Sequence, residues 1–117
     1  MSQIFLVHDR LSDPFYVNCF YGIGDWATLR MKELIREGIK IDYIVDRNVD
    51  FCGCEIEGIK VISHKELLQF KNINIIIGSL LYKKEIYVRL LNMGIREEDI
   101  FYDNFPEEMN DSFLGDY

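Results

Sequence analysis

Two glycines at the junction of an apolar segment and a helical pattern form the clearest chemical feature of this sequence. Gly22, Gly24 and Ala27 match the Gly-x-Gly-x-x-Ala form of the dinucleotide-binding fingerprint. In such a turn the first glycine makes the corner and the second lets the backbone approach a phosphate, while the small third residue lets the helix pack on the strand. Trp26, in the same turn, has a ring that can stack on a base or a sugar. The pattern predicts a nucleotide-binding turn.

An acidic residue follows at the distance that this fingerprint requires. Asp46 lies 22 residues after Gly24, at the end of the next apolar segment, where a carboxylate would accept hydrogen bonds from ribose hydroxyls. Gly78 and Ser79 end a third apolar segment. Because the carboxyl ends of parallel strands meet at one edge of a sheet, we expect the three segments to converge there.

Asp25 supports a second interpretation of the glycine turn. It falls in the first turn of the predicted helix, where its carboxylate can itself satisfy free amides and complement the helix dipole. A diphosphate at this position would meet a like charge. Two interpretations therefore stay open, a nucleotide-binding turn and an empty corner that Asp25 caps.

The elements that must position these residues alternate between apolar strands and amphipathic helices. Strands are predicted at 4–7, 15–21, 39–46, 60–62, 72–79 and 99–103, and helices at 27–35, 64–70 and 82–93. The alternation predicts an α/β fold, a small Rossmann-like three-layer domain with a mostly parallel sheet of about five strands. We expect an N-terminal extension at 1–14, the nucleotide-binding-type domain at 15–103 and a C-terminal tail at 104–117.

Composition narrows the partners and the compartment. The 117 residues include 13 Lys+Arg and 20 Asp+Glu, a formal net charge of −7, which works against nucleic acid and anionic membranes as partners. No apolar run reaches the length of a membrane span, and the N-terminus lacks a secretory pattern. Three cysteines without an export signal indicate reduced thiols, so we expect a cytoplasmic protein. Cys52-Gly53-Cys54 lacks the usual zinc-knuckle spacing, and we predict no metal site.

The order of these motifs resembles a small Rossmann-like domain of bacterial sugar metabolism. The resemblance lies in "YGIGDWATLRMKELIREGIKIDYIVD", "GCEIEGIKVISHKELL", "INIIIGS" and "LLNMGIREEDIFYD", over about residues 15–103. These segments are similar to the N-terminal domain of sugar O- and N-acyltransferases and to nucleotide-sugar or CoA-binding-like modules of surface-polysaccharide biosynthesis. The resemblance implies a ligand cleft at Gly22, Gly24, Asp25, Asp46 and Gly78.

The resemblance and the motifs together favour a nucleotide or nucleotide-sugar binding module linked to bacterial surface-polysaccharide synthesis. The hexapeptide repeats of the acyltransferase catalytic domain are missing from this sequence, so we expect an incomplete active site. The chain would be the substrate-binding part of a sugar transferase, as a homodimer or beside a partner catalytic domain. NAD is the other candidate cofactor. Two further classes stay open, an NAD- or SAM-dependent enzyme domain and a protein-interaction domain that has lost ligand binding.

Overall fold

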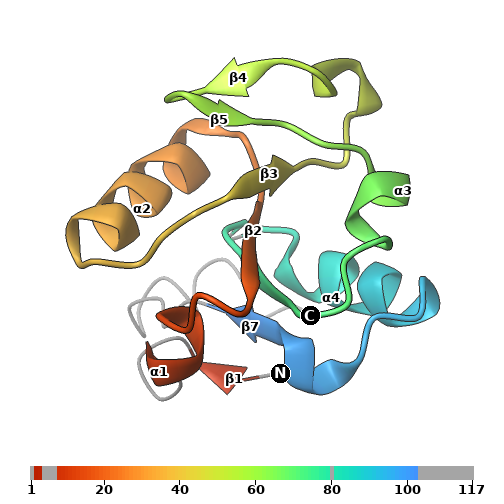
Figure 1. The fold of residues 1–117 in the computed structure, drawn as a ribbon. Helices are drawn as coiled ribbons and strands as arrows, with labels where there is room; N and C mark the ends of the chain where they lie inside the picture. Colours follow the sequence, from red (N-terminus) through yellow and green to blue (C-terminus); the bar gives the residue numbers. More distant parts are fainter. Residues whose placement is uncertain (1, 4–7, 80, 103–117) are drawn as a thin grey trace.

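A computed structural model of the chain describes residues 2–3, 8–79 and 81–102 (Figure 1). In chain order its elements are β1 (Ser2–Gln3), α1 (His8–Leu11), β2 (Val17–Tyr21), α2 (Asp25–Arg36), β3 (Tyr43–Val45), a 3-10 helix (Val49–Phe51), β4 (Glu55–Ile56), β5 (Ile59–Lys60), α3 (His64–Leu67), β6 (Ile73–Ile77), α4 (Lys83–Asn92), a second 3-10 helix (Glu97–Asp99) and β7 (Ile100–Tyr102). The predicted strand at 4–7 and the predicted tail at 104–117 lie outside the described residues.

Five strands form one parallel sheet in the order β1-β7-β6-β2-β3. β3 lies on one side of β2 in the sheet, and the next strand of the sheet along the chain, β6, lies on the other side of β2. The direction in which strands are added therefore changes between β2 and β6. Tyr21, Val45 and Ile77, the last residues of β2, β3 and β6, are in register with one another. The turns that follow these strands therefore start at one edge, where open α/β sheets bind ligands.

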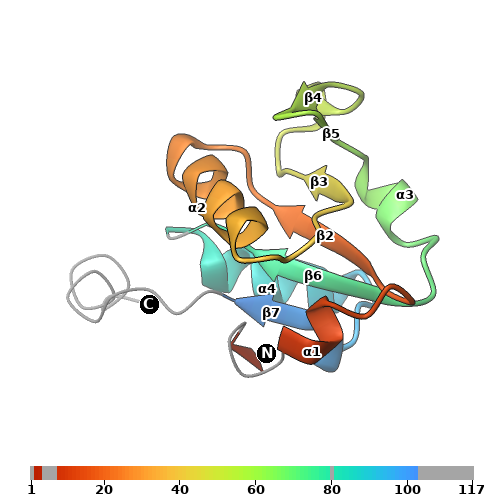
Figure 2. The same ribbon diagram turned by 60° about the vertical axis from the view of Figure 1, so that its left-hand side comes forward.

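The sheet has α2 on one face and α3 and α4 on the other (Figure 2), and each face carries an apolar layer. On one face, Phe20 and Ile76 pack with residues of α2, and on the other face Ile75 and Ile77 pack with residues of α3 and α4. All of β6 is buried, as expected of a strand that is covered on both faces. The predicted α/β, Rossmann-like, three-layer architecture is confirmed.

Several predicted bounds differ from the observed ones. The strand predicted at 60–62 is observed as β5 at Ile59–Lys60, and Val61 makes only an isolated bridge to Ile44. The strand predicted at 39–46 begins only at Tyr43, since Ile39 and Ile41 belong to the core layer under α2. The loop expected before residue 60 contains the antiparallel hairpin of β4 and β5. Glu57 and Gly58, both at positive φ, form its two-residue turn, the geometry that suits the twist of a hairpin.

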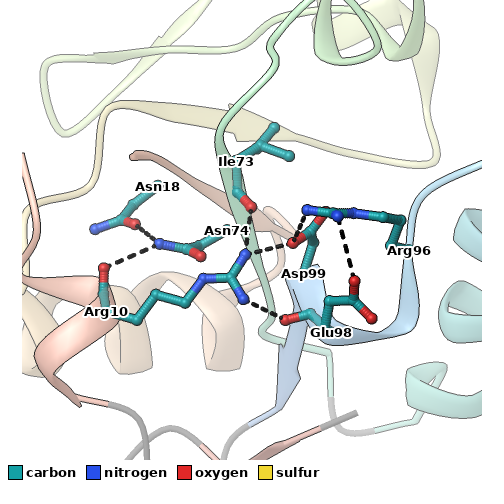
Figure 3. A network of polar contacts seen from close by, with 7 residues as sticks. All are labelled: Arg10, Asn18, Ile73, Asn74, Arg96, Glu98 and Asp99. Atoms are coloured by element: carbon teal, nitrogen blue, oxygen red, sulfur yellow. Dashed lines mark hydrogen bonds and ion pairs between the residues drawn. The ribbon is translucent and has the colours of Figure 1, made fainter. Parts of the chain in front are cut away.

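Part of the predicted extension at 1–14 packs on the domain. β1 pairs with β7, and Leu11 of α1 is buried in the α2 layer. Arg10 of α1 donates from Nη1 to the Glu98 carbonyl at 2.8 Å and forms an ion pair with the buried Asp99 (Figure 3). Asp99 also accepts from Arg96 Nε at 3.1 Å. The shared carboxylate ties α1 to the turn before β7.

Two buried asparagines extend this network across the amino ends of the strands. Asn18 of β2 and Asn74 of β6 are register partners, and Asn74 Nδ2 donates to Asn18 Oδ1 at 2.9 Å (Figure 3). Asn18 Nδ2 donates to the carbonyls of Leu11 and Lys40, each at 2.7 Å. Asn18 thereby joins α1 and the segment before β3 to the sheet. Asn74 Oδ1 has no partner in the part of the chain that the structure describes.

Candidate functional site

A cavity of about 280 Å³ opens at the carboxyl edge of the sheet, where the winding direction changes. It lies between the turn after β2, the end of β3 and the turn before α4. The lining residues are Gly22, Ile23, Gly24, Asp25, Trp26, Ala27, Asp46, Arg47, Ser79, Leu81, Tyr82 and Ile86. Six of the seven residues that the sequence selects for a site therefore meet at one cavity, and Gly78 is the exception.

Gly22 is a glycine because the corner requires it. Its φ is +136°, which other residues rarely adopt, and a Cβ there would lie 3.1 Å from the Ala27 Cβ. Its amide donates to the Val45 carbonyl at 2.8 Å, which links the corner to β3. The first and third residues of the fingerprint thus have the structural roles that the sequence predicts, a tight turn and close packing of α2.

Gly24, the N-cap of α2, has neither a strained backbone angle nor a close neighbour that would require a glycine. Its φ is −52°, open to other residues, and a Cβ built there would have no atom within 4 Å. The backbone at this position therefore faces open space beside the cavity. This is the position at which the fingerprint needs a bare backbone for a ligand to approach.

Asp25 begins α2 and is exposed at the cavity. Its carboxylate makes no hydrogen bond in the part of the chain that the structure describes. The hydrogen bond from a helix amide that an Asp25 cap would accept is therefore absent there. Two other hydrogen bonds hold the turn. The Thr28 hydroxyl donates to the Ile23 carbonyl at 2.8 Å, and the Thr28 amide donates to the Gly24 carbonyl at 2.9 Å. The Asp25 side chain faces solvent and the cavity rather than its own helix.

Asp46 and Arg47 enter the site from the end of β3. Asp46 Oδ2 accepts from the Asn48 amide at 2.9 Å, which fixes the carboxylate and leaves Oδ1 for another donor. The Arg47 guanidinium lies over the Tyr82 ring, 4.0 Å from its centroid, and 3.8 Å from Glu85 Oε2. The sequence analysis predicts no role for Arg47 or for Tyr82. The position of Arg47 directly after Asp46 was the available signal.

Gly78 and Ser79 differ in their relation to the cavity. Gly78 does not line it, and a Cβ at Gly78 would lie 2.1 Å from Phe20 Cζ, so this glycine makes room for a buried ring. Ser79 does line the cavity, and its Oγ accepts from the Tyr82 amide at 3.1 Å. Ser79 thereby fixes the turn that brings Tyr82 to Arg47.

A tyrosine and a histidine pair on the α3 and α4 face of the same strand end. The Tyr21 hydroxyl lies 2.7 Å from His64 Nε2, and neither residue lines the cavity. Burial lowers the pKa of His64, and Arg89 lowers it further, against an opposing effect of Asp46. Burial raises the pKa of Tyr21. Tyr21 and His64 are separated by 43 positions in the chain, so no local pattern indicates this pair.

The remaining candidate ligands for a metal do not gather. Cys19 is buried in β2, where desolvation raises the pKa of its thiol, whereas Cys52 and Cys54 are exposed. Within residues 2–3, 8–79 and 81–102, no group of three His, Cys, Asp or Glu is arranged to hold a metal ion. Over the same residues, no helix has the length and apolar character needed to cross a membrane.

Comparison with known proteins gives one finding. The model of the family described as "C2185-like, N-terminal" matches residues 18–101, well over half of the chain. The match begins in β2 and ends in β7, and it includes the three segments that line the cavity. No curated protein matches the chain.

Proposed function

The chain belongs to the C2185-like, N-terminal family, and we propose that it binds a nucleotide or nucleotide sugar in the cavity at the carboxyl edge of its sheet. The observation that carries this proposal is the convergence of three chain segments at the point where the winding direction changes. Ligands of open α/β sheets bind at such points. The resemblance of the motifs to sugar-modifying proteins supports surface-polysaccharide synthesis as the setting.

Two features of the cavity support a nucleotide in particular. The bare backbone at Gly24 admits a ligand that a side chain would exclude. Asp46 presents one carboxylate oxygen that is not used by the Asn48 amide, so it can accept from a ribose hydroxyl. The cavity volume of about 280 Å³ is near the lower end of ligand sites. It suits a nucleotide sugar that extends partly beyond the cavity better than a whole dinucleotide.

Thermal unfolding of the chain with candidate ligands tests the proposal. The panel is NAD, SAM, CoA, UDP, UDP-glucose and a CMP-sugar, each at millimolar concentration. A ligand at one hundred times its Kd stabilises the folded chain by about 2.7 kcal/mol, which raises the Tm by several degrees for a domain of this size. We expect a shift with one nucleotide class.

Gly24→Val is the variant that connects such a shift to the cavity. Because a Cβ at this position meets nothing, the unliganded variant should unfold close to the wild-type temperature while its side chain blocks the ligand. Asp46→Ala should reduce the shift through loss of the ribose contact. If no member of the panel shifts the wild type, the proposal is wrong, and the exposed Trp26, Leu81 and Tyr82 at the cavity favour a protein partner instead.

A further inference from the structure

We infer that Arg47, rather than the amino terminus of α2, binds the phosphate of the ligand, and that Asp25 binds a hydroxylated group beyond that phosphate. This inference rests on the proposed function and assigns two contacts within the same cavity. Its basis is the distribution of charge around the cavity and the way in which each charged side chain is held.

The charge at the start of α2 opposes a phosphate there. The amide groups of a helix amino terminus favour an anion, but here the first helical residue is Asp25, whose exposed carboxylate lines the cavity. No cation in the described part of the chain forms an ion pair with Asp25. A diphosphate on this terminus would meet an uncompensated like charge. A hydroxyl group would instead find an acceptor.

Arg47 is held at the cavity by contacts that leave its N–H groups without a hydrogen bond to Glu85. It is the one cationic side chain among the described residues that line the cavity. The guanidinium lies over the Tyr82 ring, 4.0 Å from its centroid, and its ion pair with Glu85 is long, with Nη1 3.8 Å from Oε2, beyond hydrogen-bond distance. Stacking orients the planar donor group before the ligand arrives, while its N–H groups are not committed to Glu85.

The three charged side chains then match three parts of one ligand. Asp46 accepts from ribose hydroxyls, Arg47 binds phosphate, and Asp25 accepts from hydroxyls of a group attached to that phosphate. Gly24, beside Asp25, leaves room for this group. The arrangement favours a nucleotide sugar over a dinucleotide whose diphosphate would lie on the α2 terminus.

Calorimetric titration with UDP-glucose, UDP and uridine tests this assignment. In Arg47→Gln we expect the affinity for UDP to fall by about tenfold or more, the usual effect of losing a hydrogen bond to a charged group, while that for uridine stays within about twofold. In Asp25→Asn we expect UDP-glucose to bind more weakly and UDP to bind equally well or more tightly. Lys84→Gln and Asp50→Asn are the matched controls, because they make the same charge changes at exposed positions outside the cavity.

Three results would overturn the inference and leave the proposed function standing. The first is an equal loss of UDP affinity in Arg47→Gln and Lys84→Gln, which would mean that only net charge matters. The second is a gain for both UDP and UDP-glucose in Asp25→Asn, which would mean that Asp25 only repels. The third is wild-type protein that binds NAD more tightly than UDP-glucose. Wild-type protein that binds no nucleotide overturns the proposed function, and the inference with it.

Discussion

Polar side chains are arranged differently at the amino and carboxyl edges of the parallel sheet. At the amino edge, the partly buried Arg10 forms an ion pair with the buried Asp99 (Figure 3), and the buried Asn18 donates to the carbonyls of Leu11 and Lys40. At the carboxyl edge, Asp25 and Arg47 are exposed and face a cavity. Paired buried groups favour one rigid arrangement, whereas groups held ready for a partner are suited to binding. The difference supports a structural role for the amino edge and our proposal that the carboxyl edge binds a ligand.

The largest expected effect comes from breaking the amino edge. Asn18→Ala would leave the Leu11 and Lys40 carbonyls and the Asn74 amide without their buried partner and would open a small void. We expect the free energy of unfolding to fall by about 2–4 kcal/mol, measured by urea denaturation. Asp46→Ala at the carboxyl edge should change it by less than about 0.5 kcal/mol. Equal losses in the two variants would remove the distinction between the edges.

A smaller effect separates the two glycines of the turn. Gly22→Ala places a Cβ at a strained φ and 3.1 Å from Ala27, so we expect a loss of about 1–3 kcal/mol in the free energy of unfolding. Gly24→Ala should lower it by less, about 0.5–1 kcal/mol, because its backbone angles and surroundings accept a side chain and only the preference for glycine over alanine at the N-cap of α2 is lost. Thermal and urea unfolding of both variants checks this contrast. A Gly24→Ala variant as unstable as Gly22→Ala would mean that the fold itself needs both glycines.

The smallest expected effect is a pH dependence from His64. The pKa of His64 is lowered in the folded chain, so folding disfavours the protonated imidazole. Its contribution to stability is complete above the unfolded-state pKa of 6.5 and is lost as the pH falls from there through the lowered folded-state value. Because the ring is partly exposed, we expect a loss below about 1 kcal/mol.

His64→Gln provides the comparison for this pH dependence, because glutamine can still bond to the Tyr21 hydroxyl but does not titrate. Urea unfolding of both proteins between pH 7 and pH 5 measures the difference. The wild type should lose more stability than His64→Gln over this interval. Parallel curves would show that His64 does not titrate differently in the folded and unfolded chains.

Much of the fold and of the cavity could be predicted from local patterns. The apolar segment ending at Gly22, the small Ala27 and the acid at Asp46 have fixed spacings that follow from one β-α-β unit, so they met at one edge as expected. Gly78 was assigned to the site because it also ends a strand. The structure gives it a different role, since the Phe20 ring occupies the space where its side chain would be.

The residues that sequence reasoning missed depend on contacts between distant segments. Arg47 and Tyr82 form one wall of the cavity although they are far apart in the chain, and Tyr21 with His64 is a similar case. Arg10 and Asp99 were missed for the same reason, as their ion pair joins α1 to the turn before β7. No periodicity or spacing marks such pairs.

The sequence by itself determined the alternation of β2, β3, β6 and β7 with α2, α3 and α4, the sharp corner at Gly22 and the meeting of three strand ends at one edge. These depend on hydrophobic periodicity, on backbone angles and on the geometry of parallel strands, which are local or nearly local properties. Only the tertiary structure decided which polar groups are paired and which face a cavity. That outcome depends on the distances between side chains of different segments, and these distances exist only once the layers have packed.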